Sequence, residues 1–333
     1  MNHKKQVVTG LVLIVLSGLL FPLYAREKLA QTGMQFLSIG TDARAAGLGE
    51  ATATLDMKST SLFFNPAGMA NLGGLADVAF SQISWIADIK INSFSMAFNP
   101  ANGIYGVFGL SFAYANYGEI EGTMVYPNSN GYIDTEVYKP NAMSIGIGYA
   151  RALSDKFSIG GHFKIVNEYL GKSVVPDQDG GYKVKRNLAD AVAFDFGTTF
   201  KTGYKNLIVA MMVRNFSNET KYEDEGFQLP LTFKLGISAN LFEFIAQENF
   251  QQQSLFFAID GVHPRDHSEQ LNLGLEYGYL KTFYARMGYM LNYDECGISF
   301  GCGIRKFGIA IDYGYTPYGV FENVQRISFG FSY

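Results

Sequence analysis

The stretch that decides the fold is 189–200, which has the sequence ADAVAFDFGTTF. One alternating face carries Val192, Phe194, Phe196 and Phe200, whereas the other carries small, polar or acidic side chains. Because successive side chains of a β-strand point to opposite sides, this pattern predicts a strand between an apolar and a polar environment. Soluble β-sandwiches alternate in the same way, so this pattern alone leaves a soluble protein and a membrane barrel open.

The same alternation recurs along the chain, for example in 233–241 and 271–279. About fourteen segments qualify as strands of an up-and-down barrel: 76–86, 91–98, 104–117, 142–152, 155–170, 189–200, 206–216, 230–241, 254–263, 270–279, 282–291, 297–305, 307–315 and 324–333. Most of them are about 9 to 12 residues long, as a tilted membrane-spanning strand requires, whereas strands of soluble proteins have about 5 or 6 residues. Segment length therefore favours a transmembrane barrel.

The connections between these segments alternate in length. Most even-numbered connections are short, whereas the odd-numbered ones include 118–141, 171–188 and 217–229. A bacterial outer-membrane barrel has short periplasmic turns and long extracellular loops, so both chain ends are expected in the periplasm. The long even-numbered connection 242–253 departs from this rule.

Residues 1–25 have the features of a secretory signal peptide. A basic head with Lys4 and Lys5 precedes an apolar run, and Ala25 marks the expected cleavage point. A retained anchor is the alternative, but the apolar run is short for a spanning helix. The longest uncharged stretch downstream, 91–118, is interrupted by the turn-forming residues 99–103, so we do not expect a transmembrane helix there.

Composition excludes several other classes. Aromatic residues make up 15% of the chain and charged residues 17%, which is below the roughly 25% of soluble domains and unlike a disordered protein. The net charge is -4, so no basic excess indicates nucleic acid as a partner. Cys296 and Cys302 are too far apart along one extended segment for a disulfide, and Cys302 is expected to face lipid.

The chain ends on an alternating strand with an aromatic last residue. Phe329, Phe331 and Tyr333 share one face, and small residues occupy the other. This end resembles the terminal strand that the bacterial barrel assembly machinery reads. We therefore interpret these three aromatic residues as an assembly signal.

Residues 26–75 do not alternate. A Thr41 or Asp42 cap before an alanine-rich run predicts a short helix, and residues 65–68 predict a tight turn. The segment is too apolar for a free linker, so we expect it to fill the barrel lumen as a hatch or plug.

The stretch 40–51, followed by Asp56 and 64–70, resembles the N-terminal signature of the PorV/PorQ family, which belongs to the wider group of FadL-like barrels. The resemblance extends over essentially the whole chain. It implies an all-β outer-membrane barrel and a shared hatch motif formed by Asp42, Arg44, Gly47, Asn65, Pro66, Ala67 and Gly68. It also implies a role in type IX secretion.

The small-residue faces of the strands place ionisable groups in the expected lumen. These candidate luminal charges are His162, Lys164, Asp195, Arg214, Lys234, Asp260, Glu276, Arg286, Asp312 and Arg326. Both signs are present, so the groups either pair with one another and with the hatch or line a polar conduction path. The faces show no uniformly apolar tunnel, although hatch residues such as Leu62 and Met69 could build an apolar pocket.

Catalytic motifs are missing from the sequence. No Gly-x-Ser-x-Gly elbow or phosphate-binding loop occurs in a strand-turn-helix setting, and we predict no catalytic residue, no cofactor and no metal site. The stretch 260–267 holds two His and two Asp, but Pro264 forms a turn and fixes no further ligand. The stretch 177–180 is similar to a calcium loop, yet Leu188 stands where the bidentate Glu would be needed.

The sequence therefore predicts a signal peptide (1–25), an N-terminal hatch (26–75) and a barrel (76–333) in the outer membrane of a Gram-negative (diderm) bacterium. Two functions remain open. The first is an interaction or assembly component in type IX-like protein secretion or surface attachment, with secretion-machinery or cargo proteins as partners alongside membrane lipid and the barrel assembly machinery. The second is a FadL-like passive channel for fatty acids or other hydrophobic small molecules, gated around residues 65–67.

Overall fold

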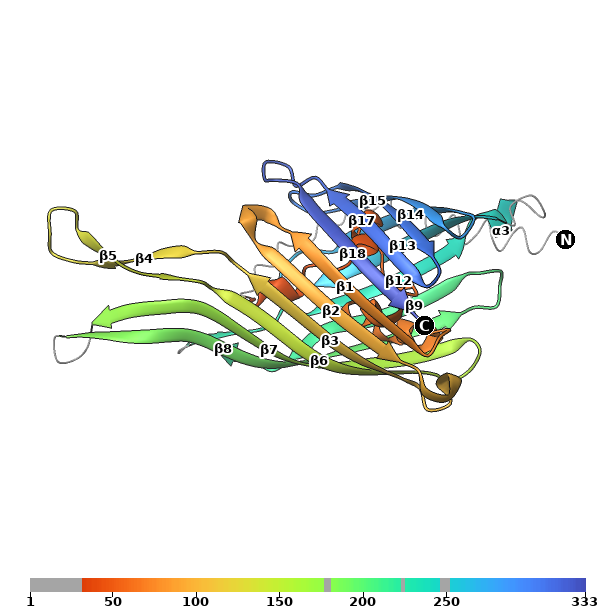
Figure 1. The fold of residues 1–333 in the computed structure, drawn as a ribbon, viewed down its shortest axis with the longest axis horizontal. Helices are drawn as coiled ribbons and strands as arrows, with labels where there is room; N and C mark the ends of the chain where they lie inside the picture. The colour runs from red at the N-terminus through yellow and green to blue at the C-terminus, as the bar shows by residue number, and fades with distance from the viewer. Residues whose placement is uncertain (1–31, 177–180, 223–224, 246–251) are drawn as a thin grey trace.

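The computed structural model describes residues 32–333 except 177–180, 223–224 and 246–251. The predicted signal peptide and residues 26–31 of the predicted hatch lie outside the described residues. The described chain forms one closed barrel with the strand order β1-β18-β17-β16-β15-β14-β13-β12-β9-β8-β7-β6-β3-β2 (Figure 1). The predicted antiparallel barrel of about fourteen strands is confirmed.

The barrel strands are β1 (Ala76–Ser84), β2 (Lys90–Phe98), β3 (Val107–Asn116), β6 (Asn141–Ala152), β7 (Phe157–Pro176), β8 (Tyr182–Lys201), β9 (Ile208–Ser217), β12 (Thr232–Asn240), β13 (Gln253–Pro264), β14 (Gln270–Tyr279), β15 (Phe283–Leu291), β16 (Ile298–Lys306), β17 (Ile309–Thr316) and β18 (Val324–Ser332). Strands that follow one another around the wall pair antiparallel, and β1 closes the barrel against β18 with Phe80 opposite Phe329. The aromatic C-terminal strand is therefore the closing strand of the barrel.

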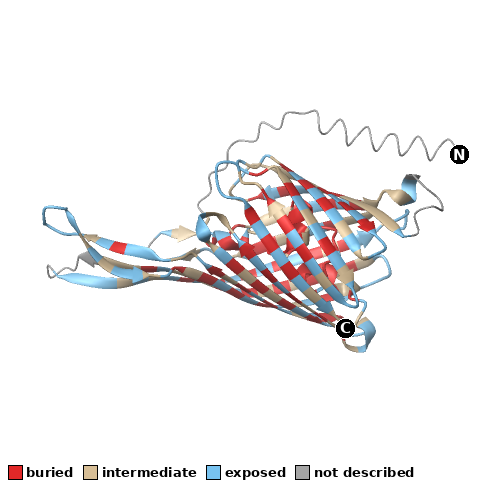
Figure 2. Ribbon diagram, turned by 45° about the horizontal axis from the view of Figure 1, so that its top comes forward, coloured by how far each residue is buried: buried red, intermediate tan, exposed pale blue. Residues whose placement is uncertain are grey.

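The wall has one exposed face and one buried face. Along β8, Phe194 and Phe196 are exposed, whereas the flanking Ala193 and Asp195 are buried. Figure 2 shows the same alternation of buried and exposed residues along the strands. Large apolar side chains thus face the membrane and small or polar ones face the lumen, as the alternation of the sequence predicts.

The predicted loops 118–141 and 171–188 were wrong in part, because much of them is strand. β4 (Ile120–Val125) and β5 (Tyr132–Tyr138) form a separate hairpin, and β7 pairs with β8 as far as Pro176 opposite Tyr182. We call residues 118–140, 170–176 and 181–187 the arm, which projects from one end of the barrel (Figure 1). Four of the six residues in 182–187 are charged or polar, and such a composition gives no sign of a half-buried strand.

The arm marks one end of the barrel, and the short helix α3 (Phe242–Ile245) marks the other (Figure 1). Following the rule that long loops are extracellular, we assign the arm to the cell surface and α3 to the periplasm. The exceptional connection 242–253 thus begins with a helix. Among the described residues, no helix has the length and apolarity needed to cross a membrane.

Residues 32–75, here called the luminal segment, pack against the inward faces of the strands. The segment contains one α-helix, α2 (Ala43–Gly47), and the 3-10 helices η1 (Gln35–Leu37), η2 (Lys58–Phe63) and η3 (Pro66–Asn71); short 3-10 turns η4 (Ile86–Asp88) and η5 (Pro100–Gly103) connect wall strands. The predicted short helix is confirmed, because the Asp42 side chain accepts hydrogen bonds from the amides at α2's N-terminus. The apolar core lies between this segment and the wall.

Candidate functional site

Helix α2 and the turn after it lie on a row of strand glycines. The row consists of Gly274, Gly288, Gly301 and Gly314, one on each of β14, β15, β16 and β17. A Cβ atom on Gly288 would lie 2.0 Å from the amide nitrogen of Gly49, and one on Gly301 would lie 2.9 Å from the Cα of Gly47. Only glycine lets the two backbones approach this closely. The predicted motif residue Gly47 is therefore part of a backbone-to-wall contact.

A second glycine row receives the turn around Asn65 and the helices beside it. Its members are Gly109, Gly148, Gly160 and Gly197 on β3, β6, β7 and β8. The Asn65 side chain accepts the amide of Ala67 and donates to the carbonyls of Ala53 and Thr198 at 2.7 and 3.2 Å. Pro66 and Ala67 lie against Gly160. The motif residues of this turn hold the luminal segment against the wall.

The structure places all ten candidate luminal charges in buried positions, none more than 8% exposed. They do not form a single row along the barrel. Most belong to two ion-pair clusters, and the remaining ones bind the backbone of the luminal segment.

The first cluster joins the luminal segment to β14, β15 and β17. Arg44 contacts Glu276 at 2.8 Å, and Arg286 contacts Glu276 and Asp312, each at 2.6 Å. The motif residue Arg44 and the wall residue Glu276 are therefore partners. Charge-assisted pairs of this kind fix geometry, and removing one partner would leave an uncompensated buried charge.

The second cluster lies in the wall between β3 and β9. Asp195 pairs with Lys164 at 2.8 Å and with His162 Nδ1 at 3.0 Å, while His162 Nε2 lies 2.8 Å from the Ser111 hydroxyl. Asp195 also accepts the amide of Asn215, where the pairing register of β8 and β9 shifts. The row resembles a Ser-His-Asp triad, but Ser111 is only 1% exposed, which fits a structural network better than an accessible nucleophile.

The remaining charges bind backbone groups of the luminal segment. Asp260 accepts the amides of Thr52 and Ala53 at 2.7 and 2.8 Å. Three basic side chains donate hydrogen bonds to backbone carbonyl oxygens of the segment: Lys234 donates to that of Glu50, Arg326 to that of Gly40 and Arg214 to that of Leu37. A buried charge needs such partners, so the wall and the segment stabilise each other.

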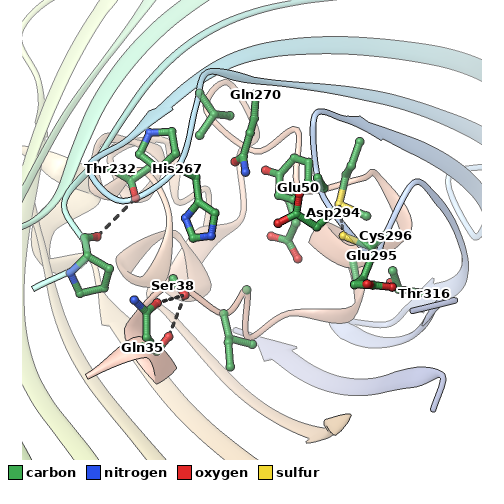
Figure 3. A pocket seen from close by; sticks show the side chains of 18 of the residues that line it. Gln35, Ser38, Glu50, Thr232, His267, Gln270, Asp294, Glu295, Cys296 and Thr316 are labelled. Carbon is green, nitrogen blue, oxygen red and sulfur yellow. Dashed lines mark hydrogen bonds between the residues drawn. The ribbon is translucent and has the colours of Figure 1, made fainter. Parts of the chain in front are cut away.

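A cavity of about 320 Å³ lies between the luminal segment and the extracellular loops, and we call it the vestibule. Arg214, Lys234, Arg326 and Glu50 are among its lining residues, and the loops between barrel strands add further acids. Figure 3 shows Glu50, Asp294 and His267 pointing into the same space. This size suits a small ligand, and the charged lining suits polar groups better than a hydrocarbon.

The loop between β9 and β12 packs against the start of the luminal segment. It carries the short strands β10 (Thr220–Lys221) and β11 (Gly226–Phe227), and its Tyr222 donates, together with Tyr117, to the two carboxylate oxygens of Glu168. Burial and the adjacent Glu168 carboxylate raise the pKa of both phenols, so they stay neutral donors. The next residue after β11, Gln228, bridges to Thr32. This loop thus connects the wall to the start of the luminal segment.

Sequence reasoning missed several residues of this region. Glu168 lies on the same face of β7 as His162 and Lys164, so the alternation could have identified it. Asp266, which accepts hydrogen bonds from Thr32 and Gln35, carries no such signal because it lies in a loop. Among the described residues, no group of three His, Cys, Asp or Glu could hold a metal ion.

Both cysteines are free, with Cys296 buried beside the vestibule and Cys302 exposed on the outer wall. The predicted absence of a disulfide between them agrees with this placement. The closed wall, the apolar outer face and the luminal segment inside define a membrane-spanning β-barrel whose lumen is occupied by its own chain.

A family model described as type IX secretion system protein PorV matches residues 24–255, which is more than half of the chain. The protein belongs to the PorV family. No functionally curated relative matches the sequence.

Solved structures with the same fold include the CymD monoaromatic hydrocarbon channel, at 12% identity and a TM-score of 0.58 over 91% of this chain and 99% of that one. The Pseudomonas putida toluene transporter TodX has 12% identity and a TM-score of 0.58 over 92% and 98%. A Pseudomonas aeruginosa FadL homologue has 12% identity and a TM-score of 0.51 over 92% and 100%. Identities this low establish the fold alone. Family and fold together place the protein in the outer membrane of a Gram-negative bacterium.

Proposed function

We propose that the protein is an interaction component of a type IX-like secretion or surface-attachment assembly, and that its arm contacts secreted proteins or the secretion machinery. The observation that carries this proposal is the arm itself. The ladder between β7 and β8 continues past the last barrel pairings, and β4 and β5 add a second ribbon beside it. Membership of the PorV family supports the same conclusion.

The arm has the surface of a contact site. The two ribbons contact each other through an exposed ion pair of 2.7 Å between Lys172 and Glu136. Val125, Tyr132 and Val184 are at least half exposed. Exposed apolar side chains on a ribbon with unpaired edges favour binding another protein.

In this proposal the luminal segment acts as a fixed plug that closes the barrel. The two glycine rows, the ion pairs of Arg44 and the backbone contacts of Asp260 support a seated segment. The protein is then a platform for binding and is not an enzyme.

A FadL-like passive channel is the second candidate. The observation that favours it is the vestibule, whose volume of about 320 Å³ falls within the range of ligand sites. Its charged lining favours a polar ligand over a fatty acid or another hydrophobic molecule. A gate around residues 65–67 would have to break the hydrogen bonds of Asn65.

The test is cross-linking in intact outer membranes, followed by mass spectrometry of co-purified proteins and bound lipid. The hairpin 119–139 can be deleted, because the Tyr117 amide already donates to the Pro140 carbonyl at 3.1 Å. The deletion should abolish protein partners while the barrel still assembles. The matched control is Phe244→Ser, which removes an exposed aromatic side chain at the periplasmic end.

Partner proteins that disappear only with the hairpin support the interaction role. Recovery of the same partners without the hairpin would contradict it. A barrel with a stoichiometric apolar ligand and no protein partner would instead support the channel.

A further inference from the structure

The outer wall has a recess in the periplasmic half of β14, β15, β16 and β17. Tyr277, Ala285, Cys302 and Tyr313 lie opposite one another in one row across these strands. The two middle residues are small, and tyrosines flank them. The rows on either side have large side chains at the middle positions, with Met287 and Phe300 in one row and Phe283 and Ile304 in the other.

This recess has a volume of about 470 Å³. Its lining includes Tyr277, Phe283, Ile304 and Tyr313 on the outward face of the wall. Because this face contacts the membrane core, its occupant has to be apolar, and an acyl chain fits an apolar slot between aromatic side chains.

Two lysines stand below the recess at the periplasmic rim. Lys281 lies in the turn between β14 and β15, and Lys306 ends β16. The two turns are adjacent, because the Arg305 amide donates to the Thr282 carbonyl at 2.8 Å. Both lysines are exposed, and Lys306 Nζ lies 5.1 Å from the centroid of the Phe307 ring. A positive patch beside an exposed aromatic ring suits the headgroup level of a membrane.

The separation of the two features matches the size of one lipid leaflet. Lys281 is four residues from Ala285, and Lys306 is four residues from Cys302. Four strand residues span about 13 Å, or about 10 Å along the membrane normal at a tilt of ~40°. The hydrocarbon of one leaflet is about 15 Å thick, so a lipid held by the lysines has its acyl chain at the depth of the recess.

We propose that this surface binds one anionic glycerophospholipid of the periplasmic leaflet. Its phosphate contacts Lys281 and Lys306, and one acyl chain fills the recess beside Ala285 and Cys302. This site lies on the outer wall and is independent of the arm and the vestibule.

The test uses native mass spectrometry of the full-length barrel released from nanodiscs of equimolar phosphatidylglycerol and phosphatidylcholine. At about 1 kcal/mol per lysine near anionic lipid, the wild type should retain phosphatidylglycerol with at least about fivefold preference. The double variant Lys281→Gln/Lys306→Gln should lose that preference. The matched control is Lys156→Gln/Lys205→Gln, which changes lysines in two other periplasmic turns and should behave like the wild type.

Cys302→Phe fills the recess and should reduce retention of both lipids. Heat-modifiable gel mobility verifies that this variant folds, and Ala285→Val replaces it if it does not. The proposal is overturned if the wild type retains no lipid or if the double variant keeps the preference. Unchanged retention in a folded recess variant also overturns it.

Discussion

The luminal segment lies inside the barrel, whereas the arm projects from one end of it, and the two regions differ in how far their side chains are buried. Residues of the segment, such as Leu48 and Leu62, are completely buried, and its backbone touches wall glycines. Arm residues such as Val125 are up to 84% exposed, although the arm is regular β-structure. The contrast indicates that the segment is built to stay in place and that the arm is built to contact something else.

The largest expected effect comes from disrupting the contact between the luminal segment and the glycine row on β14–β17. In Gly288→Val the new side chain collides with the backbone at Gly49. Neither β15 nor the luminal segment can move away without disturbing the other. We expect a loss of about 3 kcal/mol or more in unfolding free energy, or failure to assemble. Urea unfolding in detergent, followed by gel mobility, measures this.

Gly261 provides the matched control for that substitution. It faces outward, and the nearest atom to an added Cβ is the Leu235 carbonyl oxygen at 3.9 Å. Gly261→Val should therefore assemble like the wild type. Equal damage from both substitutions would mean that the glycine row does not seat the segment.

The second-largest effect compares the stability cost of a charge at two positions of one strand, one in the membrane and one in the arm. Phe194 and Val184 both lie on β8 and are 51% and 60% exposed. Phe194→Arg should cost about 2–4 kcal/mol if the residue lies mid-membrane, because its surroundings are lipid, whereas Val184→Arg should cost close to zero in water. Assembly yield and urea midpoints compare the two variants, and similar costs would contradict the assignment of the arm to solvent.

The smallest effect concerns the start of the luminal segment. Burial alone would raise the pKa of Asp266, but hydrogen bonds from Thr32 and Gln35 outweigh it and lower that pKa. A lowered pKa stabilises the folded arrangement above the ordinary Asp value of about 3.9, and this stability is lost as the pH falls through the lowered pKa.

A nitroxide label at Ser38→Cys, in a Cys302→Ser background, should therefore become more mobile only below about pH 4. Asp266→Asn should give that mobility at neutral pH. A spectrum of the wild type that is unchanged down to pH 2 would show that Asp266 does not hold this end.

The sequence was most informative where alternation is a direct consequence of the environment. Phe194 next to Asp195 predicted both the strand and its inside face, and Asp42 predicted the cap of α2. The arm was missed because water on both sides of a ribbon removes the alternation, as in residues 182–187. The ten luminal charges were recognised, but not their partners, because pairs such as Arg44 with Glu276 depend on tertiary packing.

The most direct measurement asks whether the protein works with its luminal segment locked in place. The hydroxyls of Ser59 in η2 and Ser95 in β2 are 3.0 Å apart, so Ser59→Cys/Ser95→Cys in a Cys302→Ser background offers a short tether in the oxidising periplasm. Partner capture by the arm is then compared with and without reductant. The account predicts equal capture in both states. Capture that is lost in the tethered protein and restored by reductant would contradict it.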